Sequence, residues 1–141
     1  MIRIPTRLCA QIRQAARQGY PEEVCGVLLG PPAVGAERRI VRVVPVANAR
    51  AEERARRYLI PAAELRDIEK AARRDALDVV GFYHSHPDHP AVPSTYDREH
   101  SWPWYTYIIV SVAANNTVAR AWRLADDRSA FQEEAIEEEN A

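Results

Sequence analysis

The sequence predicts an α/β protein in which helices pack on a mixed β-sheet. Segments with the spacing of amphipathic helices alternate with short apolar or β-branched segments, and the last two predicted strands follow each other with no helix between them. The length of 141 residues suits one domain. A hydrophobic content of 47% with 28% charged residues is typical of a globular chain, and it excludes a disordered polymer, a collagen-like repeat and a disulfide-rich miniprotein.

The first element is expected to be a helix over residues 6–19. Leu8 and Ile12 lie on one face at helical spacing, together with two alanines. Thr6 is expected to cap the start of this helix, and Gly19 is expected to end it.

Apolar segments and a polar loop follow this helix. Residues 24–30 are an apolar run that ends in Gly-Pro-Pro, which predicts a buried strand. Residues 39–46 are rich in β-branched side chains and are expected to form its neighbour. Residues 47–57 contain no large apolar side chain and are interpreted as a loop or a solvated helix. Residues 58–61 are a short strand candidate.

The second half of the chain is expected to begin with another helix. Pro61 suits a first helical turn, and Leu65, Ile68 and Ala72 share one face after it. The strands predicted after this helix lie at residues 78–86, 105–112 and 117–124. The last two are expected to be joined by a turn at Asn115–Asn116.

Composition also bears on location. Cys9 and Cys25 are too few for a disulfide framework, which favours a reducing compartment. No stretch approaches the roughly 20 apolar residues that a membrane span needs. Charged residues interrupt the N-terminus where a signal peptide has an unbroken apolar core. We therefore expect a cytoplasmic protein that has no membrane partner.

Charge is distributed unevenly along the chain. Residues 126–141 hold seven acidic residues and one arginine, a net charge of −6, whereas the remainder carries 18 basic and 13 acidic residues, a net charge of +5. The end of the chain is interpreted as a solvated acidic tail. The basic residues show no clustered stripe of the kind that binds nucleic acid, so no nucleic-acid partner is expected.

The strongest chemical signal lies in residues 81–97, GFYHSHPDHPAVPSTYD. Residues two apart in a strand point the same way, so His84 and His86 are expected to face one point at the carboxyl end of their strand. Asp97 follows eleven residues after His86, across a loop with three prolines. Two imidazoles and a carboxylate suit a catalytic zinc, which takes three protein ligands and leaves a fourth position for water. A pair of ordinary surface histidines is the alternative.

A longer pattern surrounds these residues. His84, Ser85 and His86 are followed after seven residues by Ser94, and after two more by Asp97. This order resembles the signature of the JAMM (MPN-plus) metalloproteases. The resemblance implies the cytidine-deaminase-like α/β fold of that family, in which helices pack on a mixed β-sheet.

A second match to the same family lies upstream. The family has a glutamate at its first strand in the pattern Glu-x-Cys/Met-Gly followed by apolar residues, and Glu23, Cys25 and Gly26 fit this pattern. The two matches occur in the order of the family, each beside a predicted buried strand. The resemblance therefore implies a metallopeptidase domain over residues 1–125, with residues 126–141 outside it as an acidic C-terminal tail.

The resemblance also implies a role for each site residue. His84, His86 and Asp97 would hold the zinc ion (Zn²⁺), and Glu23 would accept a proton from water and return it to the leaving amine. Ser94 would donate a hydrogen bond to the oxyanion of the reaction. Ser94 also suits a helix N-cap, and the two roles are compatible.

Other polar and aromatic residues near the pattern receive structural interpretations. Ser85 is expected to point away from the metal, and Cys25 to be a small core residue. His89 is interpreted as a solvated loop residue or as one that approaches the metal or the substrate. Three aromatic residues after the loop are interpreted as core packing or as a wall of the substrate cleft: Trp102, Trp104 and Tyr105.

JAMM enzymes hydrolyse isopeptide or peptide bonds at the C-terminus of ubiquitin or ubiquitin-like proteins. The chain is too short to hold much of the two insertions with which eukaryotic members grip ubiquitin, so it resembles the compact prokaryotic branch. The resemblance implies a zinc metallopeptidase that cleaves after the C-terminal Gly-Gly of a ubiquitin-like sulfur carrier protein, for example to release cysteine. Four arginines in the loop at residues 47–57 are interpreted as solvated or as a contact for an acidic patch on this carrier: Arg50, Arg54, Arg56 and Arg57.

Three other function classes fit the sequence less well than a zinc metallopeptidase does. A catalytically inactive MPN-type scaffold would have lost a ligand or the glutamate, and all are present here. A nucleobase deaminase needs His-x-Glu and Pro-Cys-x-x-Cys, which the sequence lacks. A serine hydrolase built on Ser94 would lack the Gly-x-Ser-x-Gly elbow. The sequence leaves the oligomeric state open.

Overall fold

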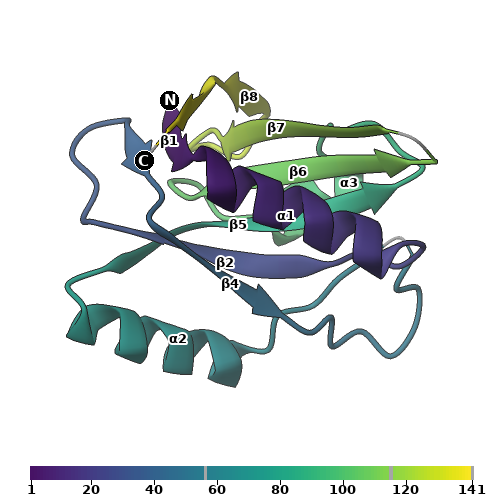
Figure 1. Cartoon of the computed structure of the whole chain (residues 1–141), viewed down its shortest axis with the longest axis horizontal. Helices are drawn as coiled ribbons and strands as arrows, with labels where there is room; N and C mark the ends of the chain where they lie inside the picture. The colour runs from purple at the N-terminus through teal and green to yellow at the C-terminus, as the bar shows by residue number, and fades with distance from the viewer. Residues whose placement is uncertain (56, 115, 141) are drawn as a thin grey trace.

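The computed structural model describes residues 1–55, 57–114 and 116–140, and within them the chain forms two β-sheets and three helices (Figure 1). The larger sheet has, in spatial order, the strands β4 (Arg42–Val46), β2 (Cys25–Gly30), β5 (Asp78–Pro87), β6 (Thr106–Ala113), β7 (Asn116–Leu124) and β8 (Phe131–Glu134). β5 and β6 run parallel, and the other neighbours are antiparallel. The predicted mixed sheet is confirmed. The predicted turn at Asn115–Asn116 includes Asn115, which lies outside the described residues.

A smaller sheet contains strands that the sequence did not predict. Its central strand, β1 (Ile2–Pro5), pairs in parallel with β3 (Arg38–Arg39) on one side and with β9 (Ile136–Glu139) on the other. β8 and β9 both come from the acidic end of the chain. Residues 131–139 therefore differ from the solvated tail that their composition predicts, because β7 and β1 provide strand edges with which they pair.

Two helices cover opposite faces of the larger sheet. α1 (Thr6–Gly19) packs in one hydrophobic cluster with side chains of β2, β5 and β6, among them Leu28 and Ile108. α2 (Ala62–Arg74) packs in a second cluster, which contains Phe82 and Tyr107. α3 (Thr95–His100) is a short helix between β5 and β6. Figure 1 shows α1 lying across the strands and α2 at the lower edge of the molecule.

Both long helices begin differently from the prediction. Pro5 occupies the N-cap position of α1 without a side-chain cap bond, so Thr6 is not the cap. Pro61 is the N-cap of α2 and precedes its first turn. A proline fits these positions because the first backbone N–H groups of a helix have no partner within it.

The strand predicted over residues 39–46 is divided between the two sheets. The Ile40 N–H donates to the Arg3 carbonyl at 2.8 Å, whereas the Val41 N–H donates to the Leu29 carbonyl at 2.9 Å. The chain therefore leaves the smaller sheet and enters the larger one within two residues. The strand candidate at residues 58–61 is wrong, because this segment pairs with no strand.

The pairing of β2 with β5 positions the upstream glutamate. Cys25 lies opposite His84, and Gly26 lies opposite Tyr83. The Tyr83 ring covers Gly26 so closely that any Cβ at this position would overlap it, which explains the glycine in the sequence pattern. Because β2 and β5 are antiparallel, the segment just before β2, with Glu23, lies at the carboxyl end of β5.

The described part of the chain, residues 1–55, 57–114 and 116–140, includes no helix with the length and apolar character needed to cross a membrane.

Candidate metal centre

Three buried side chains converge where β5 ends and α3 begins. His84 and His86 project from the same face of β5, and their Nε2 atoms lie 3.2 Å apart. The Asp97 carboxylate, from α3, lies 3.3 Å from His84 Nε2 through Oδ1 and 3.1 Å from His86 Nε2 through Oδ2. The structure thus brings together the three residues that the sequence predicts as ligands.

The start of α3 fixes the Asp97 carboxylate. The Ser94 Oγ accepts a hydrogen bond from the Asp97 N–H at 3.0 Å, and Asp97 Oδ2 accepts one from the Ser94 N–H at 2.9 Å. This is a capping box, so the predicted cap role of Ser94 is present in the structure. Burial raises the pKa of Asp97, but the two histidines and the Ser94 N–H outweigh it and hold this pKa well below its usual range.

The hydrogen bond of His86 shows what kind of ligand the cluster fits. A carbonyl oxygen only accepts, so His86 Nδ1–H donates to the Pro90 carbonyl at 2.8 Å, and in the neutral imidazole Nε2 carries a lone pair. That lone pair faces the Asp97 carboxylate and His84 Nε2. Electron-rich atoms this close repel one another unless a proton or a cation lies among them. Burial lowers the pKa of His86, but Asp97 and the Pro90 carbonyl raise it overall.

The donor set narrows the choice of cation. The ligand atoms of His84, His86 and Asp97 all lie within 4.8 Å of one another. Two imidazole nitrogens and one carboxylate oxygen match the three protein ligands of a catalytic zinc site. The residues present therefore fit a zinc ion.

Glu23 lies beside this cluster and is buried, whereas its neighbour Glu22 is exposed. The Glu23 N–H donates to the Arg54 carbonyl at 2.6 Å, and the Glu23 carbonyl accepts from Asn48 Nδ2 at 3.1 Å. Burial raises the pKa of the Glu23 carboxyl to about 7, although the electrostatic influence of His84 and His86 opposes this rise. A carboxyl group with this pKa is populated in both protonation states near neutral pH.

Glu23, His86 and Ser94 line one cleft. The Ser94 hydroxyl accepts a hydrogen bond from the Asp97 N–H, so its own proton can still be donated to a group in this cleft. His89 lies on the rim of the cleft and is exposed. The cleft therefore contains both residues that the sequence predicts to be catalytic, together with one of the predicted ligands.

Two neighbouring polar residues have structural contacts. Ser85 is fully buried, and its Oγ accepts a hydrogen bond from the Val24 N–H at 2.9 Å, which joins the start of β2 to β5. Cys25 is buried as well, with its Sγ 3.4 Å from the Val46 carbonyl. Neither side chain belongs to the metal cluster, as the sequence predicts.

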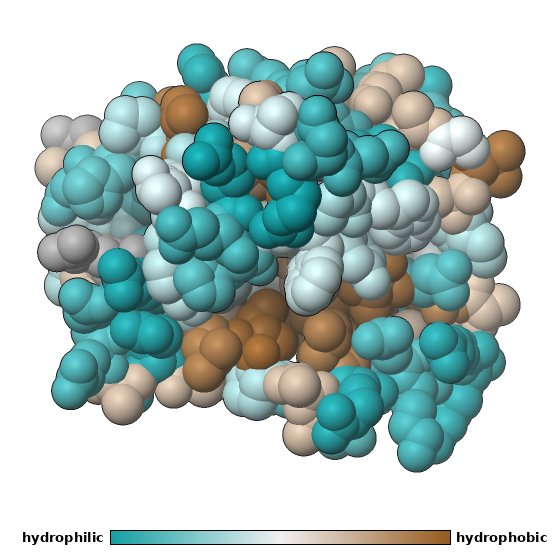
Figure 2. Space-filling model, turned by 180° about the vertical axis from the view of Figure 1, so that it is seen from behind, coloured by the Kyte–Doolittle hydropathy of each residue, from teal (hydrophilic) through white to brown (hydrophobic). Residues whose placement is uncertain are grey.

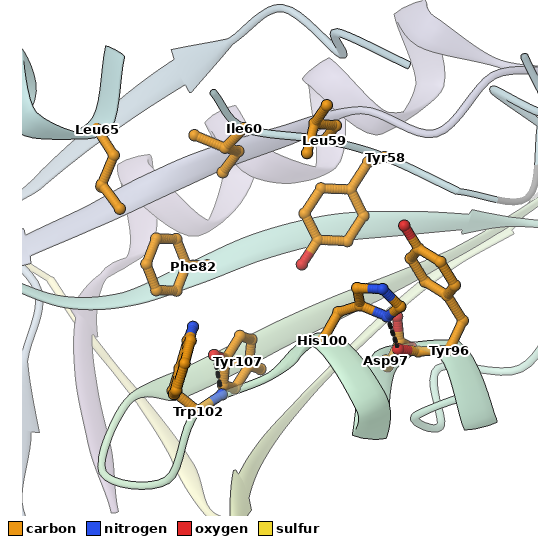
Figure 3. Close-up of a pocket in the computed structure, with 10 residues that line it drawn as sticks. All are labelled: Tyr58, Leu59, Ile60, Leu65, Phe82, Tyr96, Asp97, His100, Trp102 and Tyr107. Atoms are coloured by element: carbon orange, nitrogen blue, oxygen red, sulfur yellow. Dashed lines mark hydrogen bonds between the residues drawn. The ribbon is translucent and has the colours of Figure 1, made fainter. Parts of the chain in front are cut away.

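Asp97 also forms part of the wall of a second, mainly apolar cavity (Figure 3). Its walls are formed by Leu59, Leu65, Phe82, Trp102 and other aromatic and aliphatic side chains. The face turned away in Figure 1 shows apolar side chains around a hollow in its lower half, surrounded by hydrophilic residues (Figure 2). An apolar surface thus adjoins the polar cleft of the metal centre.

The three aromatic residues after the loop have different environments. Trp102 is 66% exposed and lines the apolar cavity. Trp104 packs beneath the Arg38 guanidinium, which lies 4.2 Å from its ring centre, and Tyr105 packs edge-on against Phe82. Of the two interpretations, the cleft wall fits Trp102 and core packing fits Tyr105, which contacts Phe82 of the second hydrophobic cluster. Trp104 is 44% exposed and does not line the apolar cavity, so neither interpretation fits it.

Sequence reasoning missed three residues around the site. The Tyr58 ring stacks on the His84 imidazole, Tyr96 lines both the cleft and the apolar cavity, and the Asn48 side chain joins the loop before α2 to Glu23. The sequence contains only weak indications of these residues. Asn48 is a single polar residue after a β-branched strand, and Tyr58 is the first large apolar residue after a polar loop.

A comparison with protein families matches residues 5–125 to Prok-JAB, the prokaryotic homologues of the JAB domain. The chain belongs to this family. Prok-JAB is the prokaryotic counterpart of the family that the two sequence patterns resemble, so the predicted membership is confirmed. Together with the relatives below, it identifies the chain as a JAB-type hydrolase.

Two relatives have names that describe an activity. The desampylase of Haloferax volcanii is 40% identical over 116 residues, which span 82% of this chain and 80% of the relative. A probable TtuB-protein conjugate cleaving protease of Thermus thermophilus is 31% identical over 100 residues, 70% of this chain and 63% of the relative.

Solved structures confirm the fold. Protein DSY2949 of Desulfitobacterium hafniense has a TM-score of 0.86 at 27% identity, with 100% of this chain and 94% of that protein covered. A protein of Salinibacter ruber has a TM-score of 0.74 at 42% identity, with 97% and 91% covered. The JAB1/MPN domain protein AF2198 of Archaeoglobus fulgidus has a TM-score of 0.62 at 18% identity, with 96% of each chain covered.

Proposed function

We propose that this Prok-JAB protein is a zinc-dependent peptidase that cleaves the bond after the C-terminal Gly-Gly of a small ubiquitin-like protein, including sulfur carriers. The observation that carries the proposal is the buried cluster of His84, His86 and Asp97, with Glu23 beside it in the same cleft. The cluster supplies the ligand set of a catalytic zinc, and Glu23 supplies a group able to transfer protons.

His84, His86 and Asp97 would hold the zinc ion. Bound there, zinc supplies a Lewis acid for the scissile carbonyl and lowers the pKa of water to about 7. Glu23 accepts the proton of the attacking water and returns it to the leaving amine. A proton-transfer group works best when its pKa is near the working pH, and burial brings the Glu23 pKa to about 7 in the metal-free protein. Ser94 donates a hydrogen bond to the oxyanion that forms on the carbonyl.

A Gly-Gly tail fits the approach to this site. The Arg57 guanidinium lies 4.6 Å from the centre of the Tyr96 ring, and both residues line the cleft. Their side chains come from different segments and meet at the cleft, which limits the room for a substrate side chain. Glycine allows the backbone to pass closely, since it has no Cβ.

The names of the two relatives support a protein conjugate as the substrate. One is a desampylase and the other a probable TtuB-protein conjugate cleaving protease. We therefore propose hydrolysis of an isopeptide bond to a lysine side chain as the main reaction, and release of a C-terminal residue such as cysteine as the second possibility.

The free cysteines Cys9 and Cys25, both buried, fit the cytoplasmic location expected from the sequence.

The test uses purified protein and a ubiquitin-like carrier whose C-terminal Gly-Gly is joined in one sample to a lysine side chain and in another to a short peptide. Mass spectrometry should detect carrier ending in Gly-Gly, and phenanthroline should abolish its release until zinc is added back. Cleavage that persists in phenanthroline would indicate a serine hydrolase. A carrier that binds and stays intact with zinc present would indicate a catalytically inactive scaffold.

Glu23→Gln separates proton transfer from metal binding. The amide cannot take a proton, so zinc content should be retained while turnover falls by roughly 10²–10⁴-fold. Glu22→Gln is the matched control, because Glu22 is exposed and adjoins Glu23 in sequence. Equal loss in both variants would refute the assignment of Glu23.

A further inference from the structure

The two predicted histidine ligands are held in different ways. A histidine that binds a metal through one ring nitrogen usually donates its other N–H to a carbonyl or carboxylate, which fixes the plane of the ring. His86 follows this rule through the Pro90 carbonyl. His84 does not: its Nδ1 is buried, and no described residue forms a hydrogen bond with it. Some other contact must keep this imidazole in its orientation.

Tyr58 provides that contact. Its ring is stacked on the His84 imidazole, with the ring centres 4.6 Å apart and the planes inclined by 22°. Rotation of the imidazole out of its plane would drive its edge into the tyrosine ring. Stacked ring pairs of this kind attract each other beyond the effect of the apolar area that they bury.

Asn48 in turn fixes Tyr58. The Asn48 side chain bonds both peptide groups that flank the tyrosine: its Nδ2 donates to the Arg57 carbonyl at 2.9 Å, and its Oδ1 accepts from the Leu59 N–H at 3.1 Å. The same Nδ2 donates to the Glu23 carbonyl at 3.1 Å. One amide side chain therefore ties the segment that carries Tyr58 to the segment that carries the proposed base.

We propose that Tyr58 is a positioning residue of the metal centre, whose ring orients His84 in place of the missing hydrogen bond, and that Asn48 holds Tyr58 in position. This inference rests on the proposed zinc site. It follows that the zinc affinity depends on the aromatic ring of Tyr58 and not on its hydroxyl. In Figure 3 this hydroxyl points away from the backbone segment of Leu59 and Ile60, into the apolar cavity.

The experiment measures the zinc dissociation constant by competition with a chromophoric chelator. Tyr58→Phe keeps the ring and should bind zinc as the wild type does. Tyr58→Leu removes the ring and should weaken binding by roughly 10–100-fold, the usual effect of losing a group that orients a ligand. Leu59→Ala is the matched control, because Leu59 lines the same cavity from the same segment, whereas the ring stacked on His84 is that of Tyr58. Its affinity should equal that of the wild type.

A purely structural role for Tyr58 predicts a loss of thermal stability without a loss of zinc affinity. Tyr58→Leu would then unfold at a lower temperature while the folded protein retained its zinc affinity and the visible spectrum of its cobalt-substituted form. Our proposal predicts a changed cobalt spectrum in Tyr58→Leu and an unchanged one in Tyr58→Phe. Equal zinc affinity in wild type and Tyr58→Leu would overturn the positioning role alone, whereas a wild type that fails to bind zinc would overturn the proposed function itself.

A double-mutant cycle tests the part played by Asn48. Asn48→Ala should weaken zinc binding by a factor similar to that of Tyr58→Leu. The double variant should lose little more than either single variant, because both substitutions remove the same contact with His84. Losses that multiply would show that Asn48 and Tyr58 act independently.

Discussion

Glu23→Gln should stabilise the metal-free protein above neutral pH, although it removes a group proposed for catalysis. The folded state keeps Glu23 protonated up to a pKa of about 7, mainly because the carboxyl is buried, whereas the ordinary value is 4.5. Between these two values the folded state binds a proton that the unfolded state has released. Its stability therefore falls as the pH rises through this window.

The size of the effect follows from the difference between the two pKa values. A pKa difference of one corresponds to about 1.4 kcal/mol. The difference of about 2.5 for Glu23 therefore lowers the free energy of unfolding by about 3 kcal/mol between pH 4.5 and pH 8. Glu23 is 5% exposed, so solvent screening reduces this figure little. Glutamine is neutral at every pH in this range, as protonated glutamic acid is. The free energy of unfolding of Glu23→Gln therefore does not fall in this way as the pH rises.

Urea unfolding of protein treated with a chelator measures this difference. At pH 4 the wild type and Glu23→Gln should have similar free energies of unfolding, and at pH 8 the variant should be more stable by up to about 3 kcal/mol. Glu22→Gln serves as the control and should follow the wild type at both pH values. A constant difference between Glu23→Gln and the wild type from pH 4 to pH 8 would refute the argument from burial.

Three further outcomes are expected. His84→Ala and Asp97→Ala should each lose zinc in elemental analysis, because two protein ligands hold the ion poorly, and full zinc occupancy in both variants would refute the ligand set. Gly26→Ala should lower the free energy of unfolding by about 1–3 kcal/mol in a denaturant titration, since the added methyl group overlaps the Tyr83 ring. Arg54→Glu should slow association with an intact acidic carrier and weaken its salt dependence, yet leave the cleavage of a short Gly-Gly peptide unchanged; stopped-flow rates at two salt concentrations decide this.

The Arg54 prediction takes account of what the structure shows for the basic loop. Arg57 pairs with Glu53 at 3.0 Å and contacts Tyr96 in the cleft, so its reversal would disturb the site itself. Arg54 is exposed. Arg56, which belongs to the same expected contact, lies outside the described residues. Arg54 is therefore the better single probe of whether this loop attracts a carrier.

Sequence patterns predicted the helices and strands that are recognisable from their own residues. The helical spacing of apolar residues gave α1 its correct bounds, and uninterrupted apolar runs located β2 and β5. β1 and β9 escaped prediction because they pair with each other from opposite ends of the chain. β9 is largely acidic, and two of its glutamates pair with arginines of the other strands in the smaller sheet: Arg3 contacts Glu137 at 3.1 Å, and Arg39 contacts Glu139 at 3.2 Å. Composition alone makes such a segment read as a solvated tail.

The metal centre also combines contacts between residues close in sequence with contacts between distant segments. His84 and His86 converge because one strand places alternate residues on one face, and Asp97 is fixed within four residues by its own capping box with Ser94. These relations are local, so a motif can record them. The orientation of His84 depends instead on Tyr58, which comes from a different segment and is held there by the Asn48 amide. α2 separates these residues from the histidines in the sequence, so only the folded structure shows that the loop before α2 contacts the metal centre.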